Sequence, residues 1–288
     1  IYLRRAGTDG RISLSPEVNR HLELCLDCRS CESACPSGVQ YGRLIEPFRA
    51  AVGAGRVAIN SGGPNASAAK PAAPGWFQKY ILYGLFPDPR RLRWSLWPAR
   101  IMQRLGLDAV AERLGLLRLL PEKLRRMHQL LPRLEAPLPA LPERLPPLVF
   151  REGRWVEASP AETRARVALF TGCVADAMFR GTHWATARVL QANGCEVLVP
   201  RSQVCCGAIH YHSGAAGPAV ELAETNARAF AGELDAIIVN VAGCGSMLKD
   251  YRHMAEETAP GDAKLAARLG GLSEKMRDVA EFLVELGP

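Results

Sequence analysis

Four cysteines near the beginning of the chain have a spacing suited to metal–sulfur chemistry. Cys25, Cys28, Cys31 and Cys35 follow the pattern C-x2-C-x2-C-x3-C, and Pro36 comes directly after the last of them. This spacing is typical of loops whose thiolates bind a [4Fe–4S] cluster. The two-residue gaps let a tight loop turn the thiolates inward, and the proline turns the backbone away. We therefore predict that these four cysteines bind iron and sulfide.

A zinc site is the alternative interpretation, and the spacing argues against it. Structural zinc sites usually pair two C-x2-C units across a longer spacer, and the chain has no second unit of that kind. In ferredoxins with two clusters, the fourth cysteine of each run binds the other cluster, so Cys35 would serve a cluster whose remaining ligands come from a second run. The sequence lacks such a run and begins at Ile1. We therefore expect a fragment whose upstream part carried the first run.

The elements that must position the remaining cysteines alternate between strand and helix. Short apolar runs at residues 167–170, 196–199 and 236–241 are separated by stretches of helical pattern, including residues 218–234. Strands that alternate with helices predict βαβ units and a parallel sheet.

Four cysteines lie just after these predicted strands. Cys173 and Cys244 follow the first and third of these strands within glycine-containing turns, and the adjacent pair Cys205 and Cys206 lies a few residues past the second strand, at residues 196–199. Ligands bind at the carboxyl edge of open parallel sheets, so we expect these four thiols to converge on one soft-metal site. Cys195 opens a strand instead, and we interpret it as a small buried hydrophobe.

Two helices are predicted to hold the first cysteine loop. Ser15 and Pro16 are typical of an N-cap followed by the first helical position, and the helix that they start leads to Cys25. Apolar residues at helical spacing between Val39 and Phe48 indicate a second helix that leads away. His21 lies near the loop, but a lone histidine there is more often a surface residue than a ligand.

The middle of the chain is a linker followed by a basic, aromatic connector. Residues 52–75 are rich in Gly, Ala, Ser and Pro, the composition of a flexible linker. Residues 76–154 hold 15 Lys and Arg against 7 Asp and Glu. Residues 99–131 predict a Leu/Arg-rich helix, and the prolines at residues 132–147 predict an extended connector.

Aromatic side chains gather at the start of this connector, close to the basic residues Arg90, Arg91 and Arg93. They are Trp76, Phe77, Tyr80, Tyr83, Phe86, Trp94 and Trp97. Aromatic residues mixed with arginines suit a membrane or protein interface, and the alternative is that they are the core of the helices that follow. A basic surface could also face nucleic acid, so a zinc-binding nucleic-acid module is the competing functional class.

Composition limits the location and the redox state. No run of about 18 apolar residues occurs, so any membrane contact would be peripheral. Nine cysteines, an odd number, without a secretory signal favour metal ligands in a reducing cytosol over a disulfide framework.

Several motifs together resemble the iron–sulfur subunit family of bacterial glycolate oxidase (glycolate dehydrogenase). They are residues 25–41, Thr171-Gly172-Cys173, Cys205-Cys206-Gly207-Ala208 with His210 and His212, and Gly243-Cys244-Gly245. The second half also resembles the cysteine-rich CCG domain of heterodisulfide reductases, lactate utilisation proteins and the anaerobic glycerol-3-phosphate dehydrogenase small subunit. The CCG pattern of these families ends in C-x2-C, whereas Met247 stands at the position of the last cysteine.

The resemblance implies an α+β multidomain protein. Residues 1–51 would be a helical ferredoxin-type cluster holder, residues 52–75 a linker, residues 76–150 a helical connector, and residues 160–288 the first of two CCG domains, of α/β type with a parallel sheet. It implies two [4Fe–4S] clusters in the intact ferredoxin domain and allows a further cluster in the CCG domain. The ligands would be Cys25, Cys28, Cys31, Cys35, Cys173, Cys205, Cys206 and Cys244.

The resemblance also implies an oxidoreductase acting on CH–OH donors. An FAD-containing dehydrogenase subunit would oxidise the 2-hydroxy acid, and this cytoplasmic chain, peripheral at the inner face of the membrane, would pass electrons to quinone without binding nucleic acid. No motif suggests a flavin or nicotinamide site here, so substrate oxidation is expected on another chain. Glycolate, lactate and glycerol 3-phosphate stay open as donors, and disulfide reduction of the heterodisulfide reductase kind is a further alternative.

Overall fold

The computed structural model describes residues 6, 11–12, 14–55, 57, 75–119 and 121–287, except for the side chains of Lys123 and Met127. Two compact units share the chain. The first, here called the cysteine unit, comprises Ile1–Gly84, Cys205–Ala231 and Ala242–Met276. The second, called the sheet unit, comprises Leu85–Val204, Gly232–Val241 and Arg277–Pro288. The expected CCG region therefore contributes to both units, and its boundaries stay a prediction.

A five-stranded sheet forms the centre of the sheet unit. Its order is β1-β5-β4-β6-β7, with β1 at Arg144–Leu145, β5 at Cys195–Leu198, β4 at Ala165–Phe170, β6 at Ala236–Val239 and β7 at Met276–Asp278. β4 runs parallel to both β5 and β6, whereas β1 pairs antiparallel with β5. The α+β architecture and the three predicted parallel strands are confirmed.

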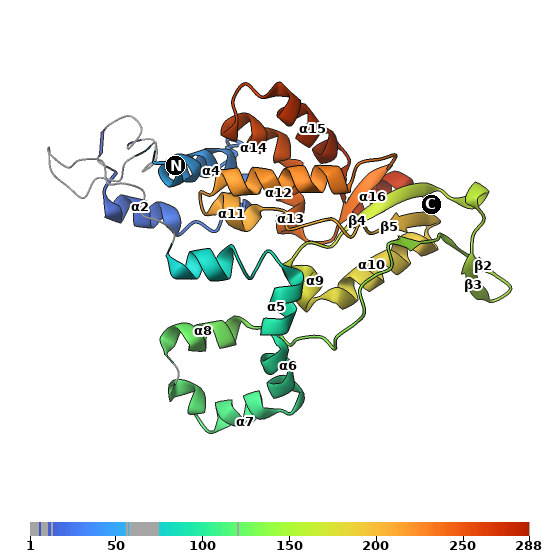
Figure 1. Ribbon diagram of the computed structural model, residues 1–288, viewed down its shortest axis with the longest axis horizontal. Coiled ribbons are helices and arrows are strands. Elements are labelled where there is room, and N and C mark those ends of the chain that lie inside the picture. The colour runs from blue at the N-terminus through green and yellow to red at the C-terminus, as the bar shows by residue number, and fades with distance from the viewer. Residues whose placement is uncertain are drawn as a thin grey trace. The chain divides into compact units, whose positions relative to one another are not determined.

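The central strands are apolar because helices cover them. Every residue of β6 is buried, and β4 exposes only Arg166, as is typical of parallel strands that are covered on both faces. α10 (Arg180–Ala192) packs against β5, and α16 (Val279–Leu286) packs against β6 (Figure 1). Leu190, Val197 and Ile238 belong to the resulting core.

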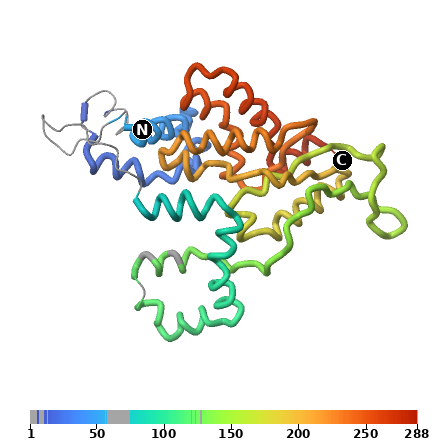
Figure 2. The backbone as a smooth tube through the Cα atoms, viewed as in Figure 1, coloured from blue at the N-terminus to red at the C-terminus, as the bar shows by residue number. Residues whose placement is uncertain are grey.

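The sequence did not predict the edge strands of this unit. β1 is only two residues long and lies among prolines, so no periodicity marks it. The hairpin of β2 (Leu148–Arg151) and β3 (Arg154–Glu157) protrudes from the sheet unit (Figure 2). Its turn places Glu152 and Gly153 at φ +50° and +79°, the left-handed pair that a two-residue hairpin loop requires.

The basic connector is a series of short helices rather than the long helix predicted for residues 99–131. The helices α5 to α8 follow one another around an open loop (Figure 1) and span Pro89–Ser95, Trp97–Arg104, Leu107–Arg113 and Glu122–Leu130. Gly106 and Gly115 adopt left-handed φ values of +68° and +69°, and Pro121 precedes α8. These residues end each helical run, because glycine tolerates positive φ and proline cannot continue a helix. The extended connector predicted after residue 131 is confirmed.

In the cysteine unit, the predicted helix–loop–helix around the first cysteines is confirmed. α2 (Pro16–Glu23) begins after Ser15, whose hydroxyl accepts a hydrogen bond from the Val18 amide. α3 (Ser30–Ser33) is a single turn within the loop, and α4 (Gly42–Gly53) leads away from it. Leu22, Ile45 and Phe48 form a small core between α2 and α4. Residue 56 and residues 58–74 of the predicted linker lie outside the described residues.

A π-helix at Phe77–Leu82 and five further α-helices follow in the described part of the cysteine unit, with α12 against α14 and α14 against α15. The five α-helices are α11 (Ala208–His212), α12 (Ala216–Ala229), α13 (Ala242–Lys249), α14 (Tyr251–Thr258) and α15 (Ala263–Glu274). Gly53, at the end of α4, meets Gly214, which follows α11, without any side chain between them. A Cβ atom at Gly53 would lie 2.5 Å from the Gly214 carbonyl oxygen, so only glycine fits. None of the helices in the described ranges is both long and apolar enough to span a membrane.

Candidate metal centre

The first cysteine loop has a backbone that turns sharply around its second cysteine. Asp27 and Arg29, on either side of Cys28, have φ values of +54° and +57°. A left-handed conformation is unfavourable for residues with a Cβ atom, and such conformations concentrate at functional sites. Cys28 and Cys31 are exposed, whereas Cys25 and Cys35 are half-buried. The loop therefore presents thiols at a surface rather than packing them in a core.

Hydrogen bonds reach several of these sulfurs, and at Cys28 and Cys35 they favour the thiolate, the form that binds metal. The Asp27 amide lies 3.4 Å from the Cys25 Sγ and donates to it. The Ser30 hydroxyl and amide lower the pKa of Cys28. The amides of Val39 and Ser37 lower the pKa of Cys35. N–H···S hydrogen bonds are also the means by which proteins tune iron–sulfur clusters, so the donor set fits the predicted group.

Side chains from α4 and α3 hold this loop in place. The Arg49 guanidinium donates to the backbone carbonyls of Leu22 and Cys25 at 3.1 and 2.5 Å. The Gly42 amide donates to the Glu32 carboxylate at 2.6 Å, which joins the start of α4 to α3. Arg49 and Glu32 were not predicted from the sequence, because side chains that hydrogen-bond to backbone atoms need not follow any fixed spacing along the chain.

Three of the four later cysteines lie together in the cysteine unit. Cys205 and Cys206 precede α11 and are buried, and Cys244 lies in the first turn of α13. The Sγ atoms of Cys206 and Cys244 are 3.4 Å apart. Gly207 follows with φ +86°, and a Cβ there would lie 3.2 Å from the Ala219 carbonyl oxygen. The glycine of the Cys-Cys-Gly motif is thus needed for both its conformation and its close packing.

A buried hydrogen-bond network fixes the backbone of this cysteine pair. The Tyr251 hydroxyl donates to the Cys206 carbonyl at 2.9 Å and accepts from the Asn226 amide at 3.1 Å. The Asn226 amide also lies 3.1 Å from the Cys205 carbonyl and donates to it. Neither side chain is exposed to solvent. Both residues escaped prediction from the sequence, since they lie within unrelated helices.

The protonated thiol is the favoured state of Cys206 without a metal. The hydrogen bond with Cys205 lowers its pKa, but the hydrogen bond and charge of Cys244, together with burial, raise it well above the ordinary value. Thiol ligands lose their protons on metal binding, so a cation would relieve this conflict between the buried Cys206 sulfur and the half-buried Cys244 sulfur beside it.

Cys173 belongs to the sheet unit. It is buried and stands between β4 and α9 (Val174–Met178). The Gln203 side chain fixes this strand end, since its Oε1 accepts from the Thr171 amide at 2.8 Å and its Nε2 donates to the Leu169 carbonyl at 3.2 Å. The convergence of Cys173 with the cysteine pair and Cys244 stays a prediction.

The cysteine and histidine outside the predicted site are placed as expected. Cys195 is fully buried in β5, and burial raises its pKa to about 11, which confirms its interpretation as a small core residue. His21 is exposed on α2, as a surface residue would be. His210 is buried and stacks on Tyr83 with ring centroids 4.6 Å apart.

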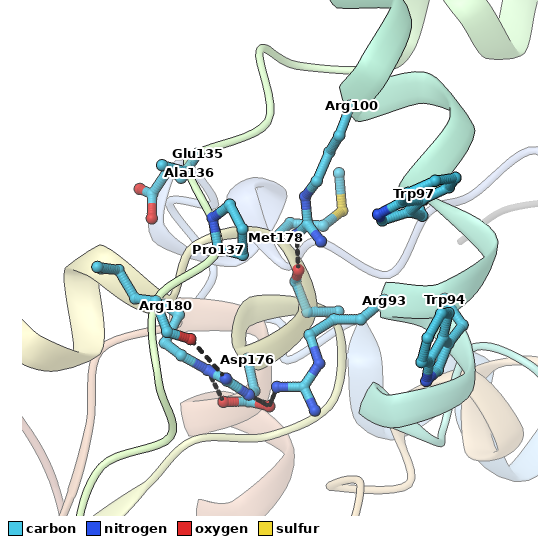
Figure 3. A pocket seen from close by; sticks show the side chains of 12 residues that line it. Arg93, Trp94, Trp97, Arg100, Glu135, Ala136, Pro137, Asp176, Met178 and Arg180 are labelled. Carbon is cyan, nitrogen blue, oxygen red and sulfur yellow. Dashed lines mark hydrogen bonds and ion pairs between the residues drawn. The ribbon is translucent and has the colours of Figure 1, made fainter. Parts of the chain in front are cut away.

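A pocket of about 290 Å³ lies in the sheet unit between the basic connector and α9 (Figure 3). It is lined by indole, apolar and guanidinium groups that include Trp94, Trp97, Arg100, Pro137, Leu138 and Met178. Asp176 at its floor accepts from Arg93 and Arg180 at 3.3 and 2.9 Å. The Arg100 Nη2 donates to the Ala177 carbonyl at 2.6 Å, but its buried Nε has no partner. The buried Nε of Arg100 is thus an unused donor beside aromatic surface.

The aromatic residues of the connector are largely exposed rather than core. Trp76 is 70% exposed, Trp94 77% and Trp97 57%. Phe77 and Tyr80 are exposed as well, whereas Tyr83 and Phe86 are half-buried. The alternative that these side chains form the core of the following helices is wrong for the five exposed ones.

Two parts of the chain match models of known protein families. Residues 73–131 match the linker region of the glycolate oxidase iron–sulfur subunit. Residues 167–249 match a cysteine-rich domain, CCG, which contains Cys173, Cys205, Cys206 and Cys244. No solved structure matches the chain.

Similar proteins extend the comparison to nearly the whole chain. The probable glycolate oxidase iron–sulfur subunit of Bacillus subtilis is 37% identical over 287 residues, which cover 99% of this chain and 59% of that protein. The glycolate oxidase iron–sulfur subunit of Escherichia coli is 28% identical over 290 residues, which cover 99% of this chain and 58% of that protein. Lactate utilization protein A of Geobacillus thermodenitrificans is 32% identical over 121 residues, 42% of this chain and 48% of that protein.

The sheet topology, the clustered cysteines and the matched domain define a protein with a cysteine-rich CCG domain, and the similar proteins are iron–sulfur subunits. More closely, the chain is a relative of the glycolate oxidase iron–sulfur subunits along nearly its whole length, which confirms the resemblance inferred from its motifs. It spans about three fifths of the length of these two relatives.

Proposed function

We propose that this chain is the electron-transfer part of a flavin-dependent 2-hydroxy-acid dehydrogenase, with glycolate as the donor. It would receive electrons from an FAD-containing subunit and pass them to quinone. The observation that carries the proposal is the pairing of two cysteine groups within the cysteine unit. One is a loop with N–H···S hydrogen bonds, and the other is the 3.4 Å approach of Cys206 and Cys244.

The chain's own residues would hold and tune the clusters. Bound [4Fe–4S] clusters would supply one-electron transfer, and the amide donors around Cys25 and Cys35 would set their potential by stabilising negative charge on sulfur. Tyr251 and Asn226 would keep the vicinal cysteines at a fixed position while the charge of the site changes. We propose all eight cysteines named from the sequence as ligands, those of the first loop for [4Fe–4S] and the remainder for a further cluster.

The pocket of the sheet unit supports quinone as the acceptor. A quinone head group is a flat ring with carbonyl oxygens, which suits indole surfaces beside the free Nε of Arg100. The pocket floor is α9, which begins directly after Cys173, so Met178 lies only about 7 Å further along the helix at 1.5 Å per residue. The exposed indoles and arginines of the connector would let the chain contact the membrane surface where quinones reside.

Two alternatives to the proposal are lactate as the donor and a zinc-binding nucleic-acid module as the function. The metal content of the chain and the protein that binds to it distinguish them from the proposal. The similarity to lactate utilization protein A makes lactate the second candidate donor, although it covers less than half of this chain. A zinc-binding nucleic-acid module would contain zinc without sulfide. Chain purified anaerobically or reconstituted should instead contain iron and acid-labile sulfide and absorb broadly near 400 nm.

The decisive experiment compares two serine variants in the assembled dehydrogenase. Cys206→Ser should remove a paramagnetic signal and abolish electron transfer from the flavin subunit to quinone, because the Sγ next to Cys244 is lost. Cys195→Ser should leave both intact, since Cys195 is a core residue of β5, and it controls for general damage to the fold. Unchanged cluster content and turnover in Cys206→Ser would refute a redox role for the cysteine pair.

A further inference from the structure

We infer that Asp27, Glu46 and His212 form a second metal site, distinct from the cysteines, for a divalent first-row transition-metal ion. All three residues belong to the cysteine unit. Asp27 comes from the first cysteine loop, Glu46 from α4 and His212 from the end of α11. Each offers one ligand atom, and the three atoms lie within 4.8 Å of one another.

The distances of the imidazole nitrogen from the two carboxylate oxygens are those of neighbouring ligands around one ion. The His212 Nδ1 lies 3.0 Å from the Asp27 Oδ2 and 3.3 Å from the Glu46 Oε1. Nitrogen and oxygen ligands bind such ions at about 2.1 Å, so two ligands at tetrahedral or octahedral angles are about 3.0 to 3.4 Å apart. Two carboxylate oxygens and one imidazole nitrogen are donors that suit Mn²⁺, Fe²⁺ and Zn²⁺.

The carboxylates are buried, and one oxygen of each has no partner. The Asp27 side chain is 1% exposed and the Glu46 side chain 0%. The Asp27 Oδ1 and the Glu46 Oε2 have no hydrogen-bond partner, and the neighbour of the Asp27 Oδ2 is the His212 Nδ1, 3.0 Å away. Buried carboxylate oxygens normally require a partner, and a shared cation would supply it.

A neighbouring ion pair supports Glu46 in the way that outer residues support metal ligands. The Arg29 Nη2 donates to the Glu46 Oε1 at 2.9 Å, and the Arg29 Nη1 is paired with Asp250. Hydrogen bonds of this kind orient ligating carboxylates. His212 is 27% exposed, which provides a route for the ion from solvent.

The charge of the cluster favours a divalent ion over a proton. Asp27, Glu46 and Asp250 contribute three negative charges and Arg29 one positive charge, a sum of −2 with neutral His212. A protonated imidazole would leave −1, whereas a divalent ion on neutral His212 would leave zero. Buried charge is costly unless it is balanced.

The competing possibility is that a proton on His212, rather than a metal ion, balances the carboxylates, and the site favours this proton as well. Burial lowers the pKa of His212, but the Asp27 and Glu46 carboxylates outweigh it and raise the pKa to about 9. Metal ions displace protons from such ligands, so the two occupants exclude each other. The experiment below decides between them.

Occupancy would fasten the first cysteine loop to the segment that follows the cysteine pair. Asp27 lies between Cys25 and Cys28, and His212 lies in the helix that starts after Cys206 and Gly207. The ion would therefore act as a structural clamp in the cysteine unit and carry no electron itself.

Manganese is the probe that separates this site from the thiolates, since Mn²⁺ prefers carboxylate ligands to sulfur. The chain with reconstituted iron and sulfide would be titrated with Mn²⁺, and free Mn²⁺ would be measured from its six-line EPR signal. We expect one ion bound per chain. His212→Gln and Asp27→Asn should each weaken binding about tenfold or more, as expected for the loss of a direct ligand.

His21→Gln is the matched control, because His21 is exposed on α2 and should leave Mn²⁺ binding unchanged. Circular dichroism and iron content would show that each variant is folded and loaded. Stoichiometric binding that both site variants weaken supports the inference. Absence of binding to the wild-type chain, or equal binding by wild type and both variants, would overturn it and assign the site to protonated His212.

Discussion

Tyr251→Phe removes one hydroxyl from the support of the cysteine pair, and its cost follows from the hydrogen bonds of that hydroxyl. The Tyr251 hydroxyl donates to the Cys206 carbonyl and accepts from Asn226, and the residue is fully buried. The phenylalanine ring would fill the same space, so no large cavity arises. The loss would come from a buried carbonyl that no longer has its donor.

The magnitude is roughly 2 kcal/mol of unfolding free energy, since an unsatisfied buried polar group costs about 1 to 3 kcal/mol. The chain contains a matched control for this substitution. Tyr211 is buried to the same degree, but its hydroxyl has no hydrogen-bond partner. Tyr211→Phe should therefore be neutral or slightly stabilising, because it removes a polar atom that is already unsatisfied.

Urea unfolding of the chain with reduced cysteines, followed by circular dichroism, measures both effects in one assay. Tyr251→Phe should unfold at a clearly lower urea concentration than wild type, and Tyr211→Phe at the same or a higher one. Equal losses in the two variants would show that ring packing rather than hydrogen bonding supports the cysteine pair. A wild-type midpoint in Tyr251→Phe would refute the role of this network.

Two further predictions concern pH and charge. Burial lowers the pKa of His183 from 6.5 to about 4, so the folded chain resists protonation of this side chain. The free energy of unfolding should therefore be highest above pH 6.5 and fall by roughly 3 kcal/mol toward pH 4. In a pH series of urea midpoints, His183→Gln should flatten this fall. Arg90→Glu with Arg91→Glu should weaken binding to anionic phosphatidylserine vesicles about tenfold or more in sedimentation at low salt, at roughly 1 kcal/mol per arginine. Arg228→Glu on α12 should not weaken it, and equal binding by all three proteins would show that the connector is only solvated surface.

Local sequence signals were sufficient for the elements that carry the cysteines. Ser15 and Pro16 predicted the start of α2 because capping depends on residues that are adjacent in the chain. The apolar runs of β4, β5 and β6 predicted parallel strands, because covered strands must be apolar on both faces. Cys195 was recognisable as core because it opens such a run.

Long-range partners were not predictable in the same way. Asn226 and Tyr251 support the cysteine pair from two separate helices, and Glu46 meets His212 across the cysteine unit. No spacing rule relates residues that only folding brings together. The continuous helix expected for residues 99–131 was wrong because helical composition was given more weight than Gly106 and Gly115, whose left-handed turns divide it.

The contact between Gly53 and Gly214 bears on how this chain can change over evolutionary time. Side-chain interfaces drift by compensating substitutions, since a smaller residue on one side can accommodate a larger one on the other. Here the backbones meet directly, and even an alanine at either position would place its Cβ 2.5 Å from a carbonyl oxygen. At this point the helix that follows the first cysteine loop and the segment that follows the cysteine pair are therefore spaced by main-chain atoms. Their surrounding sequences are free to diverge while that spacing is inherited unchanged, provided that both glycines persist.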